Sequence, residues 1–135
     1  MIKIKQIEAK QAWPIRHKVM YPEKEFDGIK LPEDSTGQHF GLFESDELIS
    51  VVSFFPDGEE AQFRKFATLD EKQRGGYGSR LLKYLIEYSK SVGTKRLWCN
   101  ARKSAIGFYK KFGFKETGQE FKDGDQEFAI IELSL

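Results

Sequence analysis

The chain has 135 residues, with 22 lysines and arginines against 21 aspartates and glutamates, and its formal net charge at pH 7 is +1. This length fits one domain over residues 1–135, built around one hydrophobic core, and is too short for two domains of ordinary size. The charges are spread evenly, which excludes the block of like charge typical of a nucleic-acid or membrane-surface partner.

The single cysteine and the short apolar runs indicate where in the cell the protein is expected. Cys99 has no second cysteine with which to form an internal disulfide. The first residues do not combine a basic region, an apolar stretch and a small-residue cleavage site. Apolar runs such as 48–55 fall far short of the roughly 20 residues that a membrane-spanning helix needs. We therefore expect a cytoplasmic protein without a membrane partner.

The first third of the chain mixes one strand, one helix and a long loop. Residues 1–8 alternate isoleucines with polar residues, as in a half-buried strand, and residues 9–20 have a short helical pattern. Pro14 is expected near the start of that helix, where a missing N–H costs little. Residues 21–37 collect prolines, glycines and acids, which predicts a loop with one helical turn near 23–26. Such a loop could border a substrate site.

Three strand-like runs follow, at 38–44, 47–55 and 60–69, separated by short turn sequences. This spacing predicts an antiparallel meander.

From Gly78 the apolar spacing becomes helical and stops at Gly93. The remaining pattern predicts a strand over 95–100, a helix over 104–112 and a C-terminal hairpin that turns around 122–124. The order of elements indicates a mixed α/β protein rather than a strictly alternating parallel sheet.

The segment 73–79, Gln-Arg-Gly-Gly-Tyr-Gly-Ser, lies between a predicted strand and a predicted helix. The first backbone N–H groups of a helix have no partner within the helix and suit an oxyanion such as a pyrophosphate. Ser79 directly follows Gly78, so the lysine of a Walker loop is absent, and the glycine spacing does not match the dinucleotide fingerprint. Without further context, the segment is explained equally well as a plain turn that starts a helix.

A second segment makes the interpretation more specific. Residues 73–78 resemble the acetyl-CoA pyrophosphate loop of the GNAT N-acetyltransferases, and residues 66–69 resemble the strand before that loop. Asn100, Ala105 and the run 108–114, Phe-Tyr-Lys-Lys-Phe-Gly-Phe, resemble the family's downstream motif at its usual distance. The resemblance implies the GNAT acyl-CoA N-acyltransferase fold, an α/β (mixed α+β) architecture with a mostly antiparallel, splayed sheet flanked by helices. It also implies acetyl-CoA as cosubstrate and is consistent with a homodimer.

The resemblance also implies roles for particular residues. The backbone of 66–68 would hold the pantetheine arm as an added strand does, and 74–79 would hold the pyrophosphate. For Asn100, capping of the next helix and the role that the resemblance suggests, contact with the pantetheine or ordering of a site water, are equally good explanations. The cofactor-binding residues implied in this way are Phe66, Ala67, Thr68, Gln73, Arg74, Gly75, Gly76, Tyr77, Gly78, Ser79 and Asn100.

Tyr109 is the predicted catalytic residue, because the resemblance places it beside the CoA sulfur, where its hydroxyl can stabilise the leaving thiolate. Its alternative role is packing in an aromatic cluster. A lysine-like amine is neutral in only about one molecule in a thousand at pH 7, so a base or a water chain is expected. The strand over 61–69 carries no carboxylate. The remaining candidates for a base, each explained more simply as a surface acid, are Glu23, Glu25, Asp27, Glu59 and Glu60.

The other reactive side chains suggest no further chemistry. Cys99 is expected to face the core, opposite Asn100, which favours direct transfer over an acetyl-enzyme. His17 and His39 form no ligand pattern with each other or with Cys99, so no metal is implied. Cations that could reach the 3′-phosphate of CoA are Arg74, Arg80, Arg102, Lys103 and Lys111.

The predicted function is direct acetyl transfer from acetyl-CoA to a primary amine of a small-molecule or protein acceptor. Two other functions remain open from the sequence. One is a noncatalytic CoA-binding or regulatory module, suggested by the missing strand carboxylate. The other is a nucleotide-binding protein that uses the same loop for another phosphate. Neither the acceptor nor the general base is specified by the sequence.

Overall fold

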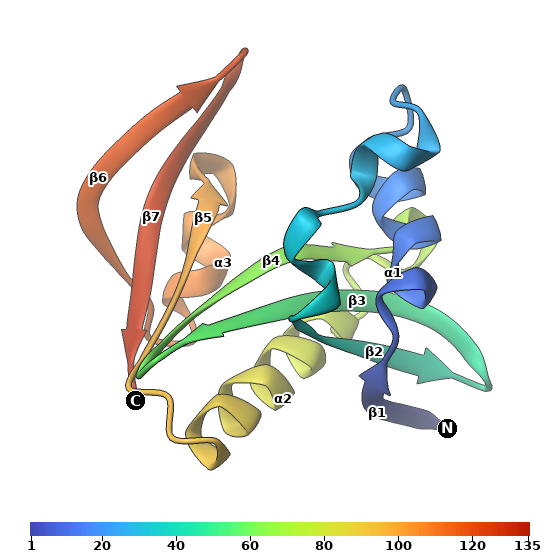
Figure 1. The fold of residues 1–135 in the computed structure, drawn as a ribbon, viewed down its shortest axis with the longest axis horizontal. Helices are drawn as coiled ribbons and strands as arrows, with labels where there is room; N and C mark the ends of the chain where they lie inside the picture. The colour runs from blue at the N-terminus through green and yellow to red at the C-terminus, as the bar shows by residue number, and fades with distance from the viewer.

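The computed structural model describes residues 1–135, which form a mixed α/β fold of one sheet and three α-helices (Figure 1). The seven strands lie in the order β1-β2-β3-β4-β5-β7-β6. The strands are β1 (Ile2–Ile7), β2 (Gln38–Glu44), β3 (Glu47–Asp57), β4 (Glu60–Thr68), β5 (Arg96–Arg102), β6 (Lys115–Asp123) and β7 (Gln126–Ser134). The helices are α1 (Ala9–Ile15), α2 (Tyr77–Ser91) and α3 (Ile106–Lys110). No helix is both long and apolar enough to cross a membrane.

Strands β2, β3 and β4 form the predicted antiparallel meander, and their bounds agree with the sequence pattern to within two residues. Ser45 and Asp46 connect β2 to β3 with positive φ angles of 50° and 71°. Two such residues in succession match the right-handed twist of a tight hairpin. The meander therefore follows from local sequence.

Helix α2 confirms the apolar stripe predicted from Gly78 onward. Leu81, Leu82 and Leu85 are fully buried, while Lys83 and Glu87 on the other side are exposed. Each fully buried leucine contributes about 1.5–3 kcal/mol relative to an exposed one. This burial attaches the helix to the sheet and fixes the position of its first turn.

The first helix differs from the prediction around Pro14. Pro14 lies inside α1, and the chain then continues as a wider π-type turn, η1 (Arg16–Met20). Proline has no N–H to donate to the preceding turn and its ring crowds that turn, so the regular helical hydrogen bonding is interrupted there. The expected position near the helix start was wrong, although the helical region itself spans 9–20 as predicted.

The loop over 21–37 contains two 3-10 turns, η2 (Phe26–Ile29) and η3 (Pro32–Ser35), rather than one turn near 23–26. A buried ion pair fastens this loop to the helix before it. The Asp34 carboxylate accepts hydrogen bonds from both terminal nitrogens of Arg16, at 2.8 and 2.9 Å, and from Trp13 Nε1 at 3.0 Å. Arg16 is fully buried and Asp34 is 6% exposed.

Strands β4 and β5 are parallel neighbours that separate after a short contact. They pair only at Glu60↔Arg96, Ala61↔Leu97 and Gln62↔Trp98. Strand β5 nevertheless continues to pair with β7 as far as Arg102↔Phe128. Figure 1 shows the two halves of the sheet diverging from this point, so both strands have a free edge facing the gap.

Candidate active site

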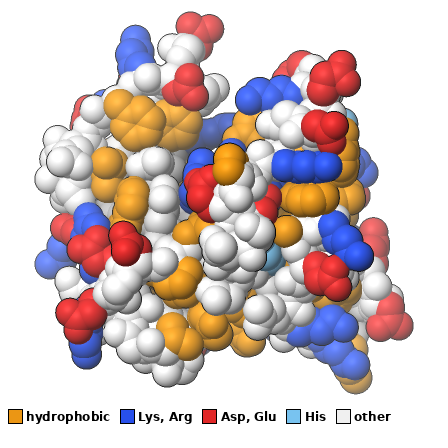
Figure 2. All heavy atoms as spheres, viewed as in Figure 1, with side chains coloured by type: hydrophobic (Ala, Val, Ile, Leu, Met, Phe, Trp, Pro, Cys, Tyr) orange, Lys and Arg blue, Asp and Glu red, His pale blue; other side chains and the backbone are white.

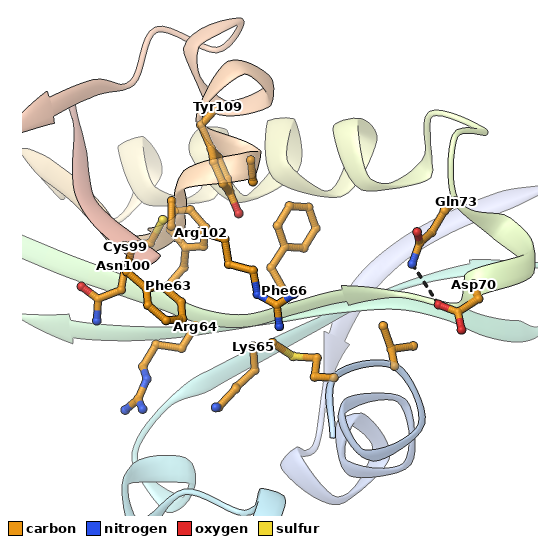
Figure 3. A pocket seen from close by; sticks show the side chains of 15 residues that line it. Phe63, Arg64, Lys65, Phe66, Asp70, Gln73, Cys99, Asn100, Arg102 and Tyr109 are labelled. Carbon is orange, nitrogen blue, oxygen red and sulfur yellow. Dashed lines mark hydrogen bonds between the residues drawn. The ribbon is translucent and has the colours of Figure 1, made fainter. Parts of the chain in front are cut away.

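A cavity of about 320 Å³ fills the opening between β4 and β5. Figure 3 shows that its walls come from both strands, with Tyr109 reaching in from α3 and Gln73 at the end nearest α2. Val19 and Met20 of η1 complete the lining. The divergence of the two strands therefore makes a cavity that side chains do not fill.

A β-bulge shapes the β4 wall of this cavity. Val51 pairs with Ala67 and Ser53 with Arg64, so two residues of β4, Lys65 and Phe66, lie opposite one residue of β3. Lys65 adopts a positive φ of 56°, which is uncommon for a residue with a side chain. The bulge turns the strand and directs Arg64 and Lys65 into the lining of the cavity.

The turn before α2 presents a row of free backbone donors. None of the six consecutive N–H groups from Arg74 to Ser79 donates a hydrogen bond within the protein, and the first helical bond runs from Arg80 N–H to the Gly76 carbonyl. These donors border a second cavity of about 550 Å³, whose cationic side chains are Lys72, Arg74 and Lys111. Free donors at the positive end of a 15-residue helix suit a diphosphate.

Two glycines give this turn its shape. Gly76 has a φ of 84°, in the left-handed region that side chains disfavour. A Cβ at Gly75 would lie 2.7 Å from Cε2 of Tyr77. The turn therefore needs glycine at both positions, for backbone conformation at one and for space at the other.

We expect Gly76→Ala to weaken CoA binding about five- to thirtyfold. Left-handed backbone costs a residue with a Cβ about 1–2 kcal/mol, and relieving that strain would turn the donors away from the ligand. Calorimetric titration with CoA measures the effect. Gly28→Ala is the matched control, because Gly28 has no left-handed φ and its added Cβ would meet only ordinary contacts. Equal affinity in both variants would contradict the role of the turn.

The turn is anchored to the end of β2. The Glu44 carboxylate accepts hydrogen bonds from the Tyr77 hydroxyl at 2.5 Å and from Lys72 Nζ at 2.8 Å. These two donors lower the pKa of Glu44, with Lys72 the larger cause. The side chain of Tyr77 thus holds the turn, while its backbone N–H remains free.

The exposed edge of β4 bears on the predicted pantetheine contacts. Leu69 N–H donates to the Ile49 carbonyl on β3 at 2.9 Å. Successive residues of a strand direct their backbone polar groups to opposite sides. Ala67 therefore also faces β3, where its carbonyl accepts the Ser50 hydroxyl, whereas Phe66 and Thr68 face the cavity. Of the three predicted residues, these two direct main-chain groups to a ligand, although the Thr68 carbonyl already accepts a hydrogen bond from Gln73 Nε2.

Gln73 contributes its side chain to the protein itself. Its Nε2 donates to the Thr68 carbonyl at 3.0 Å and to Asp70 Oδ1 at 3.2 Å. It lines both cavities, and its hydrogen bonds tie the end of β4 to the loop.

Tyr109 lies in an aromatic cluster and also points into the cavity. Its ring packs against Phe63, Phe108 and Phe114 at centroid distances of 5.2 to 5.9 Å. Its hydroxyl makes no hydrogen bond to the protein and is directed at the gap in Figure 3. Burial, and to a smaller extent Cys99, raises the pKa of Tyr109 above its usual value. The Tyr109 ring therefore belongs to the aromatic cluster, and its hydroxyl is left without a protein partner at the cavity.

Asn100 differs from the sequence expectation in two respects. It lies inside β5, which continues to Arg102, and its side chain is exposed. It makes no capping hydrogen bond to the following helical turns. It lines the cavity, so contact with the pantetheine or with a site water stays a prediction for this side chain, whereas the capping role is not seen.

The acids predicted as possible bases do not line the cavity. Glu60 pairs with Arg96 at 3.1 Å, at the closed end of the two strands. The carboxylates that do border the opening are Asp70 at the loop end and Asp123 on the β6–β7 hairpin. Sequence analysis missed Asp123 because the β6–β7 hairpin lies far from β4 in the sequence.

The five cations that could reach the 3′-phosphate of CoA lie in different parts of the structure. Arg74 and Lys111 line the cavity at the α2 turn. Arg102 lies instead between β4 and β5. Lys103 pairs with Glu120 at 2.6 Å, away from both cavities. Arg80 lines neither.

Comparison with known proteins agrees with this geometry. The acetyltransferase (GNAT) family matches residues 4–114, and the chain belongs to this family. It is 33% identical over 130 residues to the uncharacterized N-acetyltransferase YitI of Bacillus subtilis strain 168, covering 90% of this chain and 87% of that protein.

Two solved structures show the same fold at low sequence identity. One, from Lactobacillus plantarum and assigned as an N-acetyltransferase, has a TM-score of 0.89 at 18% identity, over 99% of this chain and 98% of that one. The other is a GNAT family acetyltransferase from Elizabethkingia anophelis with acetyl-CoA bound. Its TM-score is 0.78 at 21% identity, over 99% of this chain and 98% of that one.

Proposed function

We propose that the protein transfers the acetyl group of acetyl-CoA directly to a primary amine. One observation carries this proposal: the free N–H groups of 74–79, the open edge of β4 and the Tyr109 hydroxyl all border the opening left by the divergence of β4 and β5. Diphosphate, amide-bearing arm and thioester follow one another in acetyl-CoA in the same order. The related E. anophelis structure contains acetyl-CoA, which supports this choice of cosubstrate.

In this proposal acetyl-CoA supplies the acyl group as a thioester, and the residues of the chain position it. The neutral amine nitrogen forms a bond to the acyl carbon, the carbon–sulfur bond breaks with its electron pair going to sulfur, and the proton that the nitrogen loses passes to water. The Tyr109 hydroxyl donates a hydrogen bond to the sulfur as it becomes a thiolate. Full proton transfer is unfavourable, since a thiol has a pKa near 8.5 and burial raises that of Tyr109 from its usual value. Hydrogen bonding to the charge is therefore the expected contribution.

The proposal is tested by following thiol release from acetyl-CoA with a panel of amines, after calorimetry has established that CoA binds. Amine-dependent release with equal formation of N-acetyl product supports it. Binding of CoA without amine-dependent release would favour the noncatalytic CoA-binding module. The position of the candidate bases outside the cavity is the observation in that alternative's favour.

Direct transfer predicts that Cys99→Ala retains most of the activity. Cys99 is 3% exposed, and burial raises the pKa of its thiol, so the reactive thiolate is disfavoured. The measurement is kcat together with intact mass after incubation with acetyl-CoA alone. Loss of activity with unchanged folding, or an acetyl adduct that Cys99→Ala abolishes, would indicate an acetyl-enzyme instead.

A further inference from the structure

We propose that the amine acceptor carries a carboxylate and an apolar body, the chemistry of a free aromatic amino acid. The inference rests on the proposed function, because it concerns what enters the acceptor side of the same opening. It follows from the charges, the apolar walls and the size of that side.

Three cations line the opening where the acceptor would enter. Lys65 comes from the bulge of β4 and Arg64 from the residue before it, and Arg102 comes from the end of β5. Figure 3 shows the Arg102 side chain extending into the gap on the side to which the Tyr109 hydroxyl points. Figure 2 shows Lys and Arg atoms in the notch between the β6–β7 hairpin and the helical segments opposite. An anion in this notch would meet positive charge from both strands.

These cations are largely unneutralised. Arg102 has neither an ion pair nor a hydrogen bond, whereas the next residue, Lys103, is paired with Glu120 and Glu127 outside the opening. Lys65 has no carboxylate partner, and its ammonium donates to the Tyr21 hydroxyl. Arg64 uses only one nitrogen, Nη1, to bind Glu33 at 2.9 Å. Charge-assisted donors are therefore left over for a carboxylate, for which a guanidinium has the matching geometry.

The space around these cations is small, and aromatic and other apolar side chains make up about half of its lining. A further cavity of about 210 Å³ shares six lining residues with the 320 Å³ cavity and opens toward the hairpin. The shared residues are Met20, Phe63, Arg64, Lys65, Asn100 and Phe128. Phe121 and Tyr21 complete the apolar part of the smaller space. Aromatic walls of this size suit a small molecule with a ring or a branched chain.

The same cations bear on the protonation state of the amine, because the carboxylates that border the opening, Asp70 and Asp123, lie at its two ends. An ammonium near like charges is destabilised, so its neutral, nucleophilic form is favoured. The charged and titratable groups bordering the opening are Arg64, Lys65, Asp70, Cys99, Arg102 and Tyr109 in the larger cavity, with Tyr21 and Asp123 toward the hairpin. Asp70 lies at the loop end and accepts a hydrogen bond from Gln73. An acceptor carboxylate would bind to the cations while its amine loses a proton to water.

The test compares three acceptors that share one body: phenylalanine, phenylalanine amide and phenethylamine. Wild type, Lys65→Gln and Arg102→Gln are assayed with each, and folding is checked by thermal unfolding. Lys83→Gln is the charge-matched control, because Lys83 is exposed on α2 and has no ion pair. Comparing each acceptor between wild type and variant cancels differences in intrinsic amine reactivity.

We expect each site variant to lower kcat/KM for phenylalanine about ten- to hundredfold, mainly through KM, as loss of a charge-assisted hydrogen bond does. The two acceptors without a carboxylate should lose much less, because they lose only the like-charge effect of the cation on the amine. The KM for acetyl-CoA and all values for Lys83→Gln should stay unchanged. Equal losses for all three acceptors would overturn the carboxylate contact while leaving acetyl transfer intact. Higher kcat/KM for phosphoethanolamine or for a peptide N-terminus than for phenylalanine would also overturn it. CoA binding without release for any amine would overturn the proposed function as well.

Discussion

Replacement of Tyr109 by phenylalanine is expected to lower kcat by about a hundredfold or more while leaving CoA affinity nearly unchanged. Removing one positioned hydrogen-bond donor to a developing negative charge typically lowers kcat by about 10²- to 10³-fold. The ring contacts with Phe63, Phe108 and Phe114 survive the change, so the fold should too. Single-turnover release of thiol, combined with calorimetry of CoA, separates the chemical step from binding.

Tyr84→Phe is the matched control for this experiment. Tyr84 lies on α2, and like Tyr109 it packs against a phenylalanine and makes no hydrogen bond through its hydroxyl. It lines neither cavity, so its loss should leave kcat unchanged. Similar losses in the two variants would point to a general effect on stability and remove the catalytic role of Tyr109.

The direction of the Tyr109 pKa shift adds a separate check. Burial raises this pKa above the ordinary tyrosine value near 10, so the hydroxyl stays protonated throughout the usual assay range. The rate of the wild-type protein should rise as the amine loses its proton and then reach a plateau. A fall in kcat near pH 9, present in wild type and absent in Tyr109→Phe, would contradict a protonated donor.

Local sequence was sufficient for most of the fold. The strands over 38–69 alternate and are separated by turn residues, and α2 has a strict apolar stripe, so their bounds were predicted to within two residues. The turn at 73–79 was also predicted, because its glycines and position before a helix are local features. Pro14 misled the prediction because tertiary contacts of the helical region override its local preference.

The acceptor side of the site could not be predicted in the same way. The bulge at Lys65 depends on the register between β3 and β4, which the sequence of β4 alone does not specify. Arg102 was named only as one of five cations that could reach the 3′-phosphate. The resemblance implied a splayed sheet, but local sequence does not show that β4 and β5 separate after Gln62↔Trp98 or that Arg102 lies in the opening. Asp123 joins the site only through pairing of β6 with β7 and of β7 with β5. Such contacts join residues far apart in the chain.

The buried hydrogen-bond network around Arg16 could not be predicted either, because it joins residues that lie 18 and 37 positions apart in the sequence. Arg16 Nη2 donates to the Ser53 hydroxyl at 2.8 Å, Ser53 lies 2.7 Å from His39 Nδ1, and His39 Nε2 lies 2.9 Å from the Asp34 carbonyl. His39 therefore holds the loop to the sheet, a structural role that its spacing in the sequence did not reveal. Only Arg16 Nε lacks a partner in the network.

Arg16→Met should lower the free energy of unfolding at pH 7 by about 3–5 kcal/mol, because it leaves the Asp34 carboxylate buried without its cation. Burial alone would raise the pKa of Asp34, but the hydrogen bonds and charge of Arg16, with those from Leu31 and Trp13, lower it to about 2. The pair therefore stabilises the wild-type fold above the ordinary aspartate pKa near 3.8, and this contribution is lost as the pH falls toward about 2.

In Arg16→Met the unpaired carboxyl becomes protonated at higher pH, so the difference from wild type should shrink between about pH 4 and pH 2. Urea unfolding at both ends of that range and at pH 7 measures it. Glu87→Gln, which removes an exposed partner 3.6 Å from Lys90, should change stability by about 0–1 kcal/mol at pH 7. A destabilisation of Arg16→Met that is constant with pH would mean that lost packing, rather than the carboxylate, dominates. Met20 ends η1 and Tyr21 follows it, and both line the smaller cavity. Loosening of this helical region in Arg16→Met should therefore raise the KM for the amine acceptor before it affects CoA binding at 74–79.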